Sequence, residues 1–301
     1  MHKILSILFL IVTVSACVEV VDLDVDDVPR ELVVNCFFTE NQPFEVNVSR
    51  LVPYPYIQDR NIENARVSIS ENGMLKSVLK HVEKGIYTSD PFTPVRGNRY
   101  SIKVEAEGFP TATASDTLPG KVPIKNCTYQ RKAGVDEDGE PYGEITVDFT
   151  DHPGVKYYSI QFYERWVKSL YDHQGNYSGE EVLWYPVEQS SNDPAIIAEG
   201  ITKNDYSTYF VFNDALFSNK KYKLSVRASS DYDSESKLRI LLETGTEHYY
   251  QYRKRLLKHE PYSSQDPFKP YSPVPLYSNI AGGQGIFAGF QRDIYYLTFS
   301  D

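Results

Sequence analysis

The sequence contains few residues of several types, and each scarcity excludes a class of protein or of partner. Its 301 residues include only two Met, two Trp and three Cys. Three cysteines are too few for a disulfide-rich scaffold, which needs several bridges in a short chain. Positive charge is also scarce, because 41 acidic residues face 31 basic ones and leave a net charge of −10. Phosphate groups repel an acidic protein, so we expect no nucleic-acid partner.

The common catalytic and metal-binding motifs are missing as well. No histidine pair has the HExxH spacing of a zinc site, and no serine lies in the elbow motif of hydrolases. The glycine-rich stretch at residues 282–285 is not followed by the Lys-Ser/Thr pair of a phosphate-binding loop. We therefore expect neither enzymatic activity nor a metal or other cofactor.

The longest apolar segment lies at the N-terminus. Residues 4–14 are apolar except for Ser6 and Thr13, and they follow a short polar start that contains Lys3. As a helix this segment would extend only about 16 Å, far short of a hydrocarbon core of about 30 Å. A polar start, an apolar segment and two small residues form the order of a secretory signal peptide, so we expect residues 1–16 to be removed.

The end of this segment indicates a lipid anchor. The residues Val14-Ser15-Ala16-Cys17 resemble the bacterial lipobox, in which a peptidase cleaves before a lipid-modified cysteine. The resemblance implies that Cys17 is lipidated and holds the protein on a membrane, because several acyl chains together give stable anchoring. Residues 18–27 then contain five acidic residues and no basic one. We expect residues 17–30 to be a lipidated acidic linker.

The rest of the chain has the pattern of short strands. From residue 31 onwards, segments of alternating apolar and polar residues are separated by turn signals such as Asn72-Gly73. This pattern predicts a mostly β protein whose residues 31–117 form a β-sandwich, similar to immunoglobulin-like and transthyretin-like modules. The prolines that follow Leu118 mark a hinge, because proline cannot donate to a β-ladder. Residues 118–301 are expected to form a second β-sandwich-like domain.

The second domain contains one segment with a convincing helical pattern. Thr244 and Glu247 have the spacing of a capping box, and aromatic and apolar residues then recur at intervals of three and four. This pattern predicts one α-helix near residues 244–259.

Aromatic residues gather in one stretch of the second domain. We expect residues 167–192 to form a long surface excursion, and five aromatic residues lie in or next to it, namely Trp166, Tyr171, Tyr177, Trp184 and Tyr185. Aromatic rings bury large areas and stack on apolar ligand faces, so they could form a patch for a glycan or a peptide. The alternative is that they pack in the protein core.

Two further features concern covalent chemistry. Cys36 and Cys127 either form a disulfide, which an exported protein can do, or lie apart as two buried thiols, and the sequence leaves both alternatives open. The tripeptide Asp116-Thr117-Leu118 resembles the acid-hydroxyl-apolar sequon for O-glycosylation in Bacteroidota, and it predicts Thr117 as a glycosylation site.

The C-terminal region carries the most specific resemblance. Residues 266–290 read DPFKPYSPVPLYSNIAGGQGIFAGF, and the matching positions are Asn279, Gly282, Gly283, Gly285 and Phe287. Together with the lipobox and the strand pattern, this block resembles an uncharacterised family of Bacteroidota outer-membrane lipoproteins. Members of that family are typically encoded beside TonB-dependent receptors.

The resemblance implies a function without implying any catalytic residue. It implies an accessory or binding lipoprotein that acts with a TonB-dependent outer-membrane receptor in uptake or surface recognition. The acidic run after Cys17 resembles a surface-export signal, so we expect the protein to be anchored in the outer membrane and to face the cell surface. The alternative is a cell-surface adhesin or structural β-sandwich module that acts independently of a transporter.

Overall fold

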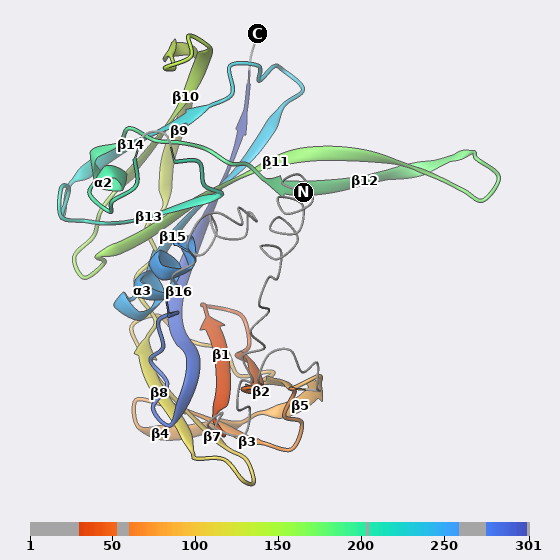
Figure 1. The fold of residues 1–301 in the computed structure, drawn as a ribbon, viewed down its shortest axis with the longest axis vertical. Helices are drawn as coiled ribbons and strands as arrows, with labels where there is room; N and C mark the ends of the chain where they lie inside the picture. Colours follow the sequence, from red (N-terminus) through yellow and green to blue (C-terminus); the bar gives the residue numbers. More distant parts are fainter. Residues whose placement is uncertain (1–29, 53–59, 203–204, 259–274, 300–301) are drawn as a thin grey trace, which may run out of the picture.

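The structure is a computed structural model that describes residues 30–52, 60–202, 205–258 and 275–299. The predicted signal peptide, Cys17 and nearly all of the acidic linker lie outside the described residues. Within them the chain is mostly β, with several sheets and two helices, which confirms the predicted fold class. The sheets form two sandwiches, which are seen one above the other in Figure 1.

The N-terminal sandwich consists of two sheets that face each other. One contains β1 (Leu32–Phe38), β2 (Glu45–Arg50), β6 (Ile86–Thr88) and β5 (Lys80–Glu83), and the other contains β4 (Met74–Val78), β3 (Arg66–Glu71), β7 (Arg99–Glu105) and β8 (Ala112–Thr117). Alternate residues of β1 and β7 are buried, as expected for strands that place one face on a core. Phe38, Phe44 and Tyr100 contact one another in that core.

The C-terminal sandwich has the same plan with longer strands. Its small sheet contains β9 (Ile124–Val135), β10 (Pro141–Thr150) and β14 (Lys221–Ala228), and the facing sheet includes β11 (Tyr157–Tyr171), β12 (Tyr177–Pro186), β13 (Tyr209–Asn213) and β15 (Lys237–Gly245). The core between them is rich in aromatic rings, among them Phe149, Tyr158 and Phe212. Ile196 of the short helix α2 (Pro194–Ile197) is also buried there, and the sequence pattern did not indicate this helix.

The last strand, β16 (Gly283–Thr298), belongs to both sandwiches. Its first half pairs in parallel with β1, from Leu32 opposite Gly283 to Phe38 opposite Gly289. Its second half pairs antiparallel with β15. One nine-stranded sheet therefore contains strands of both sandwiches. The boundary at residue 118 stays a prediction, but residues 280–289 of the expected second domain pack against the N-terminal core.

The predicted helix is present, but its N-cap lies two residues after the predicted one. Helix α3 spans Glu247–Leu257, and its N-cap is Thr246, whose side chain accepts a hydrogen bond from the Tyr249 amide. Thr244 cannot cap the helix because β15 continues to Gly245, which pairs with both β11 and β16. The Thr244 hydroxyl instead donates to the carbonyl of Gly120 at 2.6 Å.

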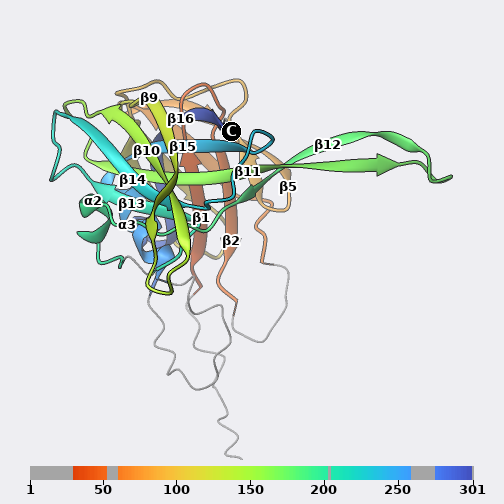
Figure 2. The ribbon, with the colours of Figure 1, turned by 90° about the horizontal axis from the view of Figure 1, so that it is seen from above.

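A long β-hairpin leaves the C-terminal sandwich sideways, as Figures 1 and 2 show. It consists of the second half of β11 and all of β12, which pair from Tyr163 opposite Pro186 to Tyr171 opposite Tyr177. β15 accompanies β11 only as far as Glu164. Beyond that residue the hairpin is a two-stranded ribbon, so the predicted surface excursion is an ordered projection.

Candidate functional site

The turn at the tip of the hairpin is polar and closed by local hydrogen bonds. The side chain of Asp172 accepts hydrogen bonds from the backbone amides of Gln174 and Asn176, at 2.8 and 2.9 Å. Gly175 has a φ of 83°, a left-handed conformation that glycine adopts without steric cost. The hydrogen bond from the Asn176 backbone is the main reason that the pKa of Asp172 is lowered. The tip therefore carries a fixed negative charge.

The five predicted aromatic residues all lie on this hairpin, but they do not form a single flat patch. Trp166 and Tyr185 contact each other on one face, with their ring planes perpendicular and their centroids 6.2 Å apart. Tyr171 and Tyr177 meet edge to face near the tip, with an interplanar angle of 80°. Trp184 lies opposite Arg165 in the ladder, and the alternation of side chains puts it on the other face from Tyr185.

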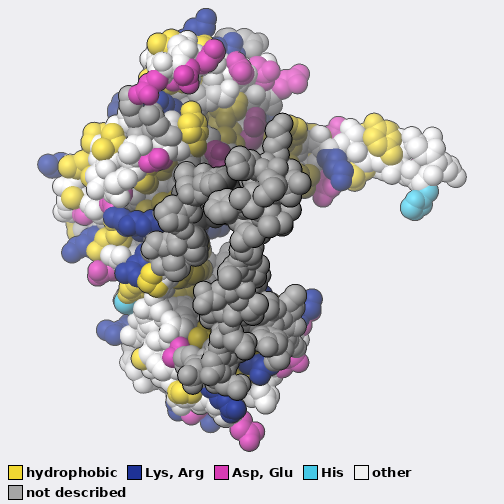
Figure 3. All heavy atoms as spheres, in the orientation of Figure 1, with side chains coloured by type: hydrophobic (Ala, Val, Ile, Leu, Met, Phe, Trp, Pro, Cys, Tyr) yellow, Lys and Arg dark blue, Asp and Glu magenta, His cyan; other side chains and the backbone are white. Residues whose placement is uncertain are grey.

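Exposed apolar side chains concentrate on the hairpin. Trp166 is 58% exposed and Tyr171 is 64% exposed, and five more large apolar residues of the hairpin are exposed, namely Val167, Leu170, Tyr177, Val182 and Tyr185. Figure 3 shows hydrophobic side chains along the projecting arm, next to charged ones. Contiguous exposed apolar surface in a folded protein commonly marks an interaction site.

The base of the hairpin is held by an arginine between two aromatic rings. The guanidinium of Arg239 lies 4.9 Å from the ring centroids of both Tyr163 and Trp184. The Trp184 ring also contacts Tyr296 of β16 at 5.7 Å. Sequence reasoning missed Tyr163, Arg239 and Tyr296, because only the register of β11, β12, β15 and β16 brings them together.

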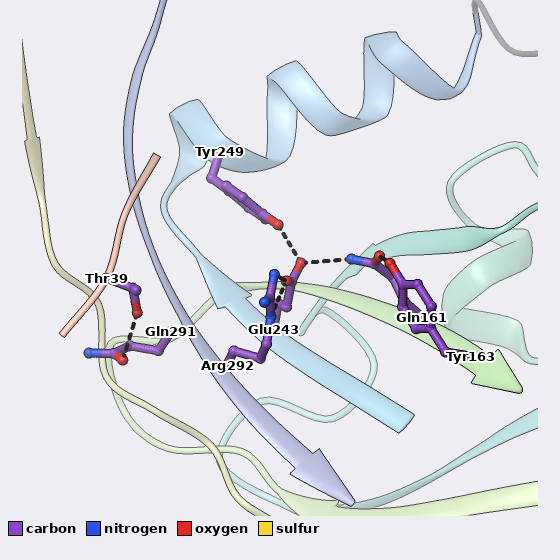
Figure 4. Close-up of polar contacts among 7 residues, drawn as sticks. All are labelled: Thr39, Gln161, Tyr163, Glu243, Tyr249, Gln291 and Arg292. Atoms are coloured by element: carbon purple, nitrogen blue, oxygen red, sulfur yellow. Dashed lines mark hydrogen bonds and ion pairs between the residues drawn. The ribbon is translucent and has the colours of Figure 1, made fainter. Parts of the chain in front are cut away.

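A buried polar network underlies this base, and Figure 4 shows it beneath helix α3. Its centre is Glu243 of β15, which is fully buried. One carboxylate oxygen accepts two hydrogen bonds from the Arg292 guanidinium, at 2.8 and 2.6 Å. The other oxygen accepts hydrogen bonds from the Tyr249 hydroxyl and from the side-chain amide of Gln161. The amide oxygen of Gln161 in turn accepts from the hydroxyl of Tyr163 at 3.0 Å.

This network has a structural role that its geometry makes clear. Every oxygen of Glu243 has donors from its own chain, and burial followed by the charge of Glu243 raises the pKa of Tyr249 well above its usual value. The phenol therefore stays protonated and donates to the carboxylate. The network joins β11, β15, β16 and α3, and it fixes the sheet from which the hairpin projects.

The two remaining cysteines lie in different cores. Cys36 is buried in the N-terminal sandwich and Cys127 in the C-terminal sandwich, and both are free thiols. Of the two alternatives that the sequence left open, the structure has the separate thiols and not the Cys36–Cys127 disulfide. Burial is the main cause of the raised pKa of both thiols, and it places the pKa of Cys127 at about 12. Neither is a reactive thiolate.

The residues of the C-terminal resemblance build the contact between β16 and β1. The side chain of Asn279 donates to the carbonyl of Phe287 and accepts from its amide, at 2.8 and 2.9 Å. A Cβ atom at Gly283 or Gly285 would lie 2.6 or 2.1 Å from a carbonyl oxygen of β1. Gly282 and Gly285 also have positive φ angles. The glycines thus allow close backbone approach, and they lie in a different sandwich from the aromatic hairpin.

Thr117 is exposed at the end of β8, where it stays a predicted glycosylation site. The preceding Asp116 is buried and is used for structure. Its carboxylate accepts hydrogen bonds from the Thr246 hydroxyl at 2.5 Å and from the Gly289 amide at 3.0 Å. Asp116 therefore ties β8 to α3 and β16 at the junction of the two sandwiches.

In the described part of the chain, no group of three or more His, Cys, Asp or Glu residues is arranged to hold a metal ion. None of the helices placed there has the length and apolar character needed to span a bilayer.

Comparisons with known proteins identify a family whose function is unknown. Residues 18–294 match the family described as "Domain of unknown function (DUF4249)". The chain belongs to this family. No curated protein matches it. A matching solved structure is a mutant of Salmonella alpha-2-macroglobulin, at 12% identity and a TM-score of 0.24, over 76% of this chain and 14% of that one. A TM-score this low does not establish a shared fold.

Proposed function

We propose that this protein is an outer-membrane lipoprotein that binds a TonB-dependent receptor and acts as its accessory in uptake or surface recognition. The observation that carries the proposal is the projecting hairpin with its seven exposed large apolar side chains. A two-stranded ribbon is only marginally stable by itself in water, and its ring pairs leave much of their surface exposed. A bound partner would bury both its faces.

The predicted anchor supports a partner in the membrane. If Cys17 is lipidated, residues 18–30 connect the lipid to β1 and extend at most about 45 Å. Both sandwiches would then lie close to the bilayer. A receptor barrel embedded in the same membrane is within reach, whereas a distant partner is not.

The continuous sheet supports a role in positioning. Because β16 pairs with β1 in one sandwich and with β15 in the other, the hairpin is connected to the anchored end of the chain through one ladder of hydrogen bonds. A partner bound at the hairpin would therefore keep a fixed orientation relative to β1, the first strand after the linker.

The test is co-purification of a TonB-dependent receptor barrel with a tagged full-length protein from mild detergent. We expect the barrel with the wild type and a large loss with the double variant Trp166→Ser, Tyr185→Ser. The matched control is Tyr206→Ser, because Tyr206 is 66% exposed but lies outside the hairpin. Recovery of the monomer alone under several growth conditions would contradict the proposal. Binding to host or matrix surfaces in a strain without the receptor gene would favour the adhesin alternative.

A further inference from the structure

The two ends of the nine-stranded sheet are built differently. At one end β5 spans only Lys80–Glu83, its register is irregular and its residues are exposed, which is how proteins usually blunt an open edge. At the other end β12 spans ten residues and pairs with β11 alone among the described strands. A long open edge with apolar neighbours invites pairing with another strand.

The backbone direction of β12 can be worked out from one hydrogen bond. The amide of Val187 donates to the carbonyl of Phe162 at 2.9 Å, so this amide points toward β11. Backbone groups alternate in direction along an antiparallel strand. Tyr185 and Leu183 therefore point their N–H and C=O groups toward β11, while those of Trp184, Val182 and Glu180 point outward.

The charges along the ribbon differ between its two strands. β12 carries Glu180 and Glu181, both exposed, and no basic residue. The basic residues of the ribbon, Arg165 and Lys168, lie on β11. A strand that adds to the outer edge of β12 would have the two carboxylates as nearest charged neighbours, so electrostatic complementarity favours a basic segment.

Other ligand classes fit the ribbon less well. Its ring pairs meet at 90° and 80°, so they offer no pair of parallel ring faces for a sugar to stack on. The tip carries the ionised Asp172 and polar neighbours, which oppose insertion into a membrane. An open edge flanked by side-chain surfaces is the arrangement that binds extended peptide segments.

We propose that the outer edge of β12 is a strand-addition site, which takes an extended segment of a partner protein, with basic and apolar residues, as a tenth strand of the sheet. The identity of the partner as a receptor barrel rests on the proposed function, but the strand-addition site itself does not. The added strand would pair with the outward backbone groups of Glu180, Val182 and Trp184, and side chains on both faces of the ribbon would cover it.

Substitution of Val182 separates backbone pairing from side-chain contact. Val182→Pro removes an N–H that points outward, so the β11–β12 ladder keeps its hydrogen bonds. A carbonyl group of the added strand then has no donor on β12. Val182→Thr is the matched control, because it keeps the N–H and the β-branched shape. If the barrel co-purifies with the wild type and with Val182→Thr but is reduced at least tenfold with Val182→Pro, strand addition is supported. Equal recovery with all three overturns strand addition and leaves the proposed function standing.

A peptide probe tests the edge without the receptor. The full-length protein is mixed with a seven-residue peptide of alternating Lys and Val, and amide exchange is followed along β12. We expect slower exchange at the outward amides, and less slowing with Glu180→Lys or with a Glu-Val peptide. If no barrel co-purifies with any variant, the proposed function fails. The amide-exchange measurement then decides by itself whether β12 is a strand-addition site. Unchanged exchange at these amides overturns it.

Two other occupants of the edge are outcomes of the same experiments. Sedimentation of the purified protein would show a dimer that Val182→Pro disperses if a second copy occupied β12. Flotation with phosphatidylethanolamine and phosphatidylglycerol vesicles, lost in a Tyr171→Ser, Tyr177→Ser variant, would show a lipid surface at the hairpin. Either result overturns the assignment of the edge to a basic partner segment.

Discussion

β16 and β11 both extend beyond the C-terminal sandwich, and they end in opposite surroundings. The first half of β16 enters the N-terminal sandwich, where Ile286, Phe287 and Ala288 are fully buried. The second half of β11 enters solvent with β12 as its only partner among the described strands. The small residues of β16 let neighbouring backbones approach, whereas the hairpin has large exposed residues on both faces. An extended strand is thus buried in one case and exposed in the other.

The largest expected loss of stability comes from adding a side chain where the backbones of β16 and β1 lie close together. Gly285→Ala would place a Cβ atom 2.1 Å from the Val34 carbonyl oxygen at a φ of +113°. Overpacking and backbone strain together should lower the free energy of unfolding by about 4 kcal/mol, measured by urea denaturation. The matched control is Gly179→Ala in the hairpin, where φ is +143° but no atom lies within 4 Å. Equal losses in the two variants would contradict the close-approach explanation.

The next effect tests the network that supports the base of the hairpin. Glu243→Ala leaves the buried Tyr249 hydroxyl and the buried Gln161 side-chain amide without their acceptor and should cost about 3 kcal/mol of stability. Glu181→Ala on the exposed ribbon should change stability by less than about 0.5 kcal/mol. Thermal and urea unfolding of both variants provide the measurement. A small effect at Glu243 would mean that α3 and β16 hold the sheet without the network.

A smaller effect should appear in the pH dependence at the junction. Burial raises the pKa of Asp116 above its unfolded value, although Thr246, Gly289 and the nearby His248 favour its ionised form. A carboxyl group with a raised folded pKa binds more protons in the folded state, so stability falls as pH rises from the unfolded pKa through the folded one. Asp116→Asn should remove this slope, because the amide does not titrate. If the free energy of unfolding depends on pH in the same way in the wild type and in Asp116→Asn, this explanation of the slope is wrong.

The smallest effect on stability is expected in the hairpin itself. Trp166→Ser should change the free energy of unfolding by less than about 0.5 kcal/mol, because the ring is 58% exposed. The same variant should reduce capture of the receptor barrel. A stability loss comparable to that of Glu243→Ala would show that the exposed rings serve the fold and not a partner.

The sequence predicted the class of fold because the signal for strands is local. Alternate burial in β1 and β7 follows directly from the period-two pattern of their residues. The helix was found for the same reason. Its cap was misplaced because the pairing of Gly245 with β11 and β16 extends β15, and that pairing involves residues far away in the sequence.

The candidate site was only partly predictable. The sequence found the aromatic residues of the hairpin but left open whether they were exposed, since the same composition suits a core. It could not find Arg239 or Tyr296, which reach Trp184 through strand register. It also could not decide between a disulfide and two thiols, because the separation of Cys36 and Cys127 depends on which core each strand joins.

By itself, the sequence determined a β-rich chain with strand and turn signals and a glycine-rich C-terminal block, and it predicted an N-terminal signal peptide. The tertiary structure decided that this block crosses into the other sandwich and pairs with β1, and that β11 continues into an open ribbon. The physical reason is that side-chain periodicity is encoded over a few residues. The choice of a strand's neighbours depends on the packing of segments that lie far apart in the sequence, as β1 and β16 do.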